Sequence, residues 1–95
     1  MQQVNDSRVV ISVLGSDRPG IVAGVSSVLA EHKVNIEDIT QTVLQDTFTM
    51  TMIVDINEAD ASFEDIKASL ARLDEKLGVQ TLVQKEELFN YMYRL

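Results

Sequence analysis

The sequence has no cysteine, no tryptophan, one proline and four glycines among its 95 residues. Without cysteine there is neither a disulfide framework nor thiol chemistry. No apolar run approaches the roughly 18 residues that a membrane-spanning helix needs. Residues 1–6 also lack the basic start and apolar stretch of a signal peptide, so we expect a cytoplasmic protein.

Positive charge is scarce as well. Eight lysines and arginines stand against 15 aspartates and glutamates, which gives a net charge of −7. Nucleic-acid binding and docking on an anionic membrane both need clustered positive charge, so neither partner is expected. The length suits one domain over 1–95, with a core at about 8–84 and a C-terminal helical extension at 86–95.

The first half of the chain predicts a strand, a helix and a second strand. Residues 9–14 are apolar on both faces and end at Gly15, which is typical of a central strand covered on both sides. Residues 19–32 have one apolar face at helical spacing, with Asp17 as the N-cap or a first-turn carboxylate. Residues 34–44 form a strand whose apolar pattern changes phase, which predicts a bulge or an edge strand.

The second half repeats this order. Gln45 and Asp46 suit a hairpin turn, and residues 47–56 alternate between apolar and polar residues, with Ile53 as the one apolar residue in the polar set. Ser62 and Asp65 resemble a capping box for an amphipathic helix that ends at Gly78. A fourth strand at 79–84 and a short helix at 86–95 follow.

This order predicts an α+β fold, the ferredoxin-like βαββαβ sandwich: a four-stranded antiparallel sheet with two helices on one face, plus a short C-terminal helix. The other sheet face then needs a cover, and the C-terminal helix and a second subunit are both candidates. Three of the five aromatic residues, Phe89, Tyr91 and Tyr93, lie in that last segment. They suit docking on the same chain as well as a dimer contact.

The turn between the first strand and the first helix has the most distinctive chemistry. Pro19 suits a first helical turn, and Gly20 lets a ligand or another chain approach the backbone. The free N–H groups of a starting helix hold a carboxylate, which favours binding of a small acid such as an amino acid.

Other polar residues give weaker indications. His32, the only histidine, lies at a helix end with no neighbouring nucleophile in the sequence, so no catalytic role is expected. Glu37 and Asp38 are adjacent on a strand, where they are expected to point to opposite faces. On that geometry they form no acid/base pair.

With this topology, two motifs resemble the ACT domain, a small amino-acid-sensing module, over roughly residues 8–84. The motifs are Asp17-Arg18-Pro19-Gly20-Ile21-Val22 and Val34-Asn35-Ile36. The whole chain, including its tail, is similar to a family of stand-alone ACT-domain proteins. It is more distantly similar to the ACT domains of the glycine cleavage system repressor.

The resemblance implies paired domains, with small ligands bound where the first strand–helix loop of one domain meets the second strand of its partner. The backbone amides near Gly20 would take a ligand carboxylate, Asn35 would hydrogen-bond either end of the ligand, and Asp17 would pair with an ammonium group. One wall would comprise Asp17, Arg18, Pro19, Gly20, Ile21 and Val22, and the other Asn35, Ile36 and Asp38.

The sequence departs from serine-binding ACT domains that resemble those of phosphoglycerate dehydrogenase. Those domains place a polar side chain, often His, two residues before the position of Asp17, and often Asn at that position itself. In this chain the first of these positions is Gly15, so one side-chain contact is missing. The second is Asp17, so a carboxylate replaces an amide.

The expected function is therefore a non-catalytic regulatory module that binds a small molecule as a homodimer, with no metal, no cofactor and no catalytic residue. One alternative is a protein-binding module with no small ligand, whose output passes through another protein. A less favoured one is a small acylphosphatase-like enzyme, which would use Arg18 and Asn35 but lacks a glycine-rich phosphate cradle.

Overall fold

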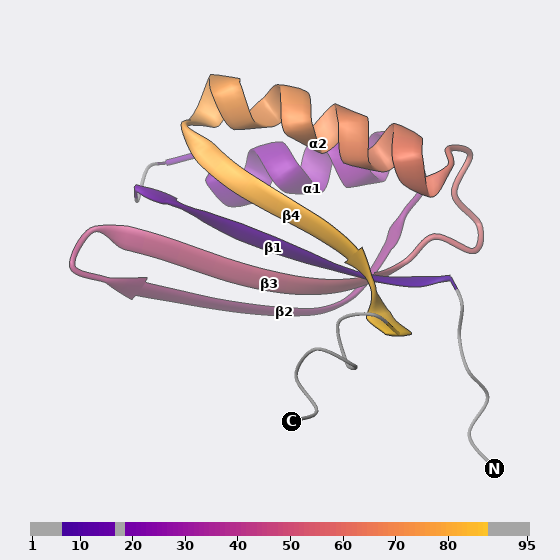
Figure 1. Ribbon diagram of the computed structural model, residues 1–95, viewed down its shortest axis with the longest axis horizontal. Coiled ribbons are helices and arrows are strands. Elements are labelled where there is room, and N and C mark those ends of the chain that lie inside the picture. Colours follow the sequence, from indigo (N-terminus) through magenta and orange to yellow (C-terminus); the bar gives the residue numbers. More distant parts are fainter. Residues whose placement is uncertain (1–6, 17–18, 88–95) are drawn as a thin grey trace, which may run out of the picture.

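The computed structural model describes residues 7–16 and 19–87. The elements in chain order are β1 (Arg8–Ser16), α1 (Ile21–Glu31), β2 (Asn35–Leu44), β3 (Thr47–Asp55), α2 (Phe63–Leu77) and β4 (Val79–Lys85). The strands form one antiparallel sheet in the order β2-β3-β1-β4, and both helices lie on one side of it (Figure 1). The predicted ferredoxin-like α+β fold is thus confirmed. The predicted C-terminal helix falls mainly on 88–95, outside the described residues.

The core fills the space between the helices and the sheet. Strand β1 pairs with β3 on one side and β4 on the other, so it is the central strand that its apolar sequence predicted. Every second residue of a strand faces the same side. On β1, the fully buried side chains that face the helices are Val9, Ile11 and Val13. The helices pack against them with the fully buried Ile21, Val25, Leu29, Ile66 and Leu70.

The opposite face of the sheet, which we call the open face, is covered unevenly. Val10 is only 2% exposed there, whereas Leu14, four residues along the same strand, is 47% exposed. The prediction that β1 is covered on both sides therefore holds at the Val10 end, whereas one chain by itself leaves the Leu14 end uncovered. The strand also runs one residue past Gly15, to Ser16.

Strand β2 lies at the sheet edge and carries the predicted bulge. Its register with β3 shifts between Ile36 and Asp38, which leaves Glu37 as the extra residue. Because of the bulge, Glu37 reaches Arg8 on the open face, 3.1 Å from Nε, and Asp38 pairs with Ile53 on that same face. The expectation that Glu37 and Asp38 point to opposite faces is therefore wrong.

Helix α1 starts later than predicted. Its N-cap is Gly20, with φ 90° and ψ −2°, and its first turn contains no acidic residue. Asp17 is therefore neither the N-cap nor a first-turn carboxylate, although its own position lies outside the described residues. Pro19 precedes the helix instead of opening it, because Gly20 has a left-handed backbone that a helical residue does not adopt.

The remaining turn and cap predictions are confirmed. Gln45 and Asp46 both have positive φ, at 50° and 68°, as a two-residue hairpin turn of the primed type requires. Ser62 Oγ accepts from the backbone N–H of Asp65 at 3.1 Å, and Asp65 Oδ2 accepts from that of Ser62 at 3.3 Å. Gly78 ends α2 in the left-handed conformation.

Replacing Ser62 with alanine removes one half of the capping box, so an N–H in the first turn of α2 loses its side-chain partner. We expect the free energy of unfolding to fall by about 1 kcal/mol. Urea denaturation measures this loss as a lower midpoint with an unchanged slope. Ser27→Ala, at an exposed position inside α1, is the matched control and is not expected to lower the midpoint, because alanine favours a helix interior more than serine does. Equal midpoints for Ser62→Ala and the parent chain would contradict the capping role.

Candidate functional site

The first wall of the predicted site is the turn that leads into α1. Pro19 and Gly20 are exposed, and a Cβ built on Gly20 meets nothing within 4 Å. The space over this backbone is thus open to a ligand or another chain. Ile21, by contrast, is 1% exposed because its side chain packs in the core, and Val22 is half-buried. These two residues offer only main-chain N–H groups to a ligand.

The second wall lies at the start of β2. Asn35 and Asp38 are exposed, whereas Ile36 is half-buried against the core. Asn35 borders a surface hollow of about 470 Å³, whose lining is Lys33, Val34, Asn35, Asp55, Asn57 and Glu58. Sequence reasoning did not place Lys33 or Glu58 at the ligand site, because these two residues come together only through the fold.

These two walls lie at opposite ends of the sheet in one chain. Ser16, next to the turn before α1, pairs with Thr47, which also pairs with Leu44 at the far end of β2. Asn35 pairs with Asp55, which pairs with Arg8 at the other end of β1. Nine residues of strand, about 30 Å, separate Asn35 from Leu44. One chain therefore does not bring the two walls together. Asp17 and Arg18 lie outside the described residues.

Gly15 faces α2 and β4, and the structure gives a reason for the missing side chain. A Cβ at this position would lie 2.8 Å from Val79 Cγ1 and 3.0 Å from the carbonyl oxygen of Gly78. The second neighbour is backbone and cannot rotate away. The polar side chain that the resemblance to serine-binding ACT domains predicts here has no room in this chain.

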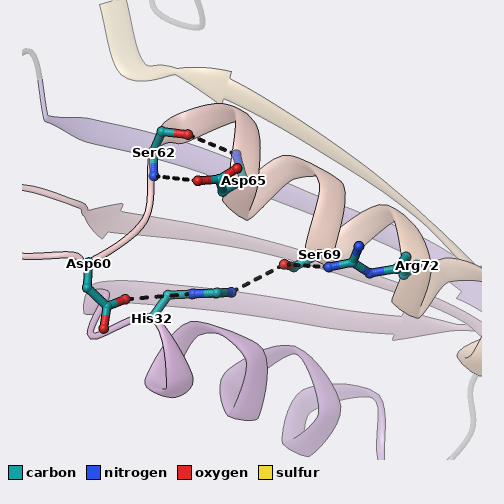
Figure 2. A network of polar contacts seen from close by, with 6 residues as sticks. All are labelled: His32, Asp60, Ser62, Asp65, Ser69 and Arg72. Carbon is teal, nitrogen blue, oxygen red and sulfur yellow. Dashed lines mark hydrogen bonds and ion pairs between the residues drawn. The ribbon is translucent and has the colours of Figure 1, made fainter.

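His32 belongs to a polar network between the two helices. Its Nε2 lies 3.2 Å from Ser69 Oγ, its Nδ1 lies 3.8 Å from Asp60 Oδ1, and Arg72 donates to the same Ser69 hydroxyl at 3.2 Å (Figure 2). The residue types are those of a catalytic triad. However, 3.8 Å is too long for the hydrogen bond that orients such a histidine.

The backbone N–H of Asp60 also donates to the carbonyl of His32, which ties the loop before α2 to the end of α1. The His32 network thus links the end of α1 to α2 and to the loop before α2. On the chain it lies next to the second wall, because Lys33, which borders the Asn35 hollow, directly follows His32. Among the described residues, no group of three or more His, Asp or Glu is placed to hold a metal ion.

The fold and the exposed turn define a class of protein: small α+β domains of ferredoxin-like topology with an open turn before the first helix and a free sheet edge. In the part of the chain that the structure describes, no helix has the length and apolarity to cross a bilayer. The ACT domain family model matches residues 7–84, and the chain belongs to this family. Its members are regulatory modules.

A close relative is the UPF0237 protein MK1213 of Methanopyrus kandleri, which is 54% identical over 89 residues and covers 94% of this chain and 99% of its own. Among solved structures, an ACT domain protein from Streptococcus pneumoniae is 36% identical with a TM-score of 0.75, covering 86% of this chain and 92% of that one.

A more distant structure, described as a glycine cleavage system transcriptional repressor, is 23% identical with a TM-score of 0.71. The match covers 82% of this chain and 44% of that one, and it shows the shared fold alone. The predicted resemblance to the ACT domain, to stand-alone members of it and, more distantly, to this kind of repressor is confirmed.

Proposed function

We propose that this protein is a non-catalytic regulatory module that binds an amino acid or another small carboxylate between two copies of the chain. The observation that carries the proposal is the position of the two walls. Both the Gly20 turn and Asn35 are exposed, and they lie at opposite ends of the sheet. A symmetric pair of chains joins them without any change in the fold.

Antiparallel pairing of two β2 edges supplies the required geometry. It places the start of one β2 beside the end of the other, so Asn35 of one copy approaches Leu44 and the Gly20 turn of its partner. Strand β2 is exposed along its length except at the half-buried Ile36. Ile39 and Val43 lie 41% and 52% exposed on it, and a second copy would remove them from water.

The chemistry of the two walls is complementary to a zwitterion. The N–H groups of Ile21 and Val22, at the positive end of α1, would take the carboxylate. The amide of Asn35 both donates and accepts, so it would bind either end of the ligand. Asp17 would take the ammonium group, and Asp38 and Glu58 add negative charge to the second wall.

A thermal-shift screen of the twenty amino acids at millimolar concentration tests the ligand. At 100 times its dissociation constant, a ligand that binds only the folded state adds about 2.7 kcal/mol. In a domain of this size that raises the Tm by on the order of 10 °C.

Asn35→Ala is expected to abolish the shift, whereas Gln80→Ala, at an exposed position on β4, is expected to retain it. If none of the twenty amino acids shifts the Tm, the proposal of an amino-acid ligand is contradicted. The proposal of a dimer would be unaffected, because light scattering tests it separately.

A protein-binding module without a small ligand is the second candidate. The observation that favours it is a hollow of about 620 Å³ on the open face, bordered by the exposed side chains of Leu14 and Leu82. Acylphosphatase-like chemistry is less favoured, because the loop that contains Arg18 and the Asn35 side chain stand at opposite ends of one chain.

A further inference from the structure

The sheet has two edges, and they differ in what lies beside them. Strand β2 forms one edge and is exposed along its length except at the half-buried Ile36. Strand β4 forms the other edge and, among the described residues, pairs with β1 alone. The outward N–H and C=O groups of an edge strand can pair with a strand of another chain, so proteins commonly block such edges with charged side chains.

Asp74 of α2 lies against the middle of the β4 edge. The backbone N–H of Thr81 donates to Asp74 Oδ2 at 3.1 Å. In an antiparallel pair, every second residue turns its N–H away from the partner strand, and the bond to Asp74 places Thr81 in this outward set. Helix α2 runs beside β4 and so holds the carboxylate at this edge (Figure 1). An incoming strand would need the Thr81 N–H for one of its own carbonyls.

The position of Asp74 is otherwise unfavourable for a carboxylate. It lies in the last turn of α2, where the helix dipole disfavours negative charge. Its second oxygen, Oδ1, is buried and has no hydrogen-bond partner in the described part of the chain, and a buried acceptor of this kind costs free energy. Neither helix formation nor core packing accounts for an aspartate here, whereas the bond to the Thr81 N–H does.

The charge of Asp74 adds to this effect. Two paired strands exchange N–H and C=O groups, so a carbonyl oxygen of an incoming strand would approach the place that Asp74 Oδ2 occupies. That oxygen carries partial negative charge and is repelled by the carboxylate. Asp74 therefore both uses the donor that a new strand needs and repels the acceptor that it brings.

We propose that Asp74 closes the β4 edge to a second copy of this chain, so that edge pairing takes place at β2 alone and ends at two copies. If both edges were open, β2 of one copy would pair with β4 of the next, and a head-to-tail contact that does not close gives a filament. The limit of two copies rests on the β2 dimer of the proposed function. The closed β4 edge is a property of the single chain and does not depend on a ligand.

Sedimentation of Asp74→Ala across a concentration series tests the effect on assembly. We expect association beyond the dimer to be at least about tenfold stronger than in the parent chain, because the Thr81 N–H is then available to a new strand. Asp74→Asn keeps an acceptor at this place, and Glu75→Ala removes the same charge from an exposed neighbouring position, so both are expected to assemble as the parent does. An Asp74→Ala chain that also assembles as the parent does overturns the proposal.

Adding Ile39→Lys and Val43→Lys to Asp74→Ala separates edge pairing from aggregation of unfolded chains. A filament needs both edges, so this triple variant is expected to form at most a dimer through β4, with an unchanged circular dichroism spectrum. Growth of the triple variant past two copies means that other surfaces associate, and it overturns the proposal.

Amide hydrogen exchange at Thr81 tests the closed edge in the single chain. At a protein concentration low enough for the chain to be monomeric, we expect the Thr81 amide to exchange at least about tenfold faster in Asp74→Ala than in the parent or in Asp74→Asn, because the outward N–H has lost its acceptor. Equal rates in all three chains overturn the proposal. If the rates differ as expected while the parent is a monomer at every concentration, the β2 dimer of the proposed function fails and the closed β4 edge stands.

Discussion

Replacing both Ile39 and Val43 with lysine is expected to give a folded monomer, with the dimer dissociation constant raised about 1,000-fold. Each side chain is roughly half exposed on the edge strand of a single chain. Burying the exposed part of four such side chains across a two-fold axis contributes on the order of 4 kcal/mol, which corresponds to that factor. Lysine at both positions removes this term and adds like charges to the β2 edge.

Light scattering or sedimentation across a concentration series measures the change. Leu82→Lys is the matched control, because it puts the same charge on an exposed leucine of the open face, away from β2. We expect that variant to remain dimeric, with an unchanged circular dichroism spectrum for both proteins. If the β2 double variant dimerises as the parent does, the β2 edge is not the interface. If Leu82→Lys alone gives a monomer, the open face is the interface.

The second large effect concerns Gly15. Gly15→His is expected to lower the free energy of unfolding by about 3 kcal/mol and to confer no serine binding. The new Cβ would overlap the Gly78 carbonyl oxygen and Val79, at 3.0 and 2.8 Å, and overpacking against fixed backbone costs about this much.

Ser16→His, one residue along, is the control. Ser16 is exposed, so the same side chain is expected to change stability by less than about 0.5 kcal/mol. Urea denaturation of the two variants compares them directly. If the Gly15→His chain is as stable as the Ser16→His chain, the backbone at the start of β4 shifts at little cost in free energy. The structural reason given for the glycine would then be wrong.

Much of the fold was predictable because short-range patterns determine it. The alternation along β3, the capping box of Ser62 and the terminal Gly78 each depend on a few adjacent residues and on known backbone geometry. The phase change in β2 likewise indicated its bulge before the partner strand was known.

The start of α1 was misplaced for a physical reason. Proline fits the first turn of a helix and also the position before a left-handed glycine in a turn, so Pro19-Gly20 is compatible with both. Only the φ of 90° at Gly20 decides between them. The pairing of Glu37 with Arg8 depends on the bulge, which changes the face of every residue that follows it.

The candidate site was less predictable because its parts are far apart. The motif residues around Gly20 and Asn35 are recognisable in the sequence, but their separation by the length of β2 appears only in the fold. Lys33 and Glu58, which border the Asn35 hollow, lie in the turns that follow α1 and β3. Nothing in their sequence spacing links them.

Complementation between two defective chains tests the central claim most directly. Gly20→Val damages the first wall and Asn35→Ala the second, so each variant alone is expected to bind none of the amino acid that gives the largest thermal shift. Mixed in equal amounts and allowed to exchange, half of the dimers pair one intact Gly20 turn with one intact Asn35. Calorimetry should then recover about a quarter of the parent's binding sites. If mixing restores no binding while the chains exchange, the two walls do not form one site across the dimer.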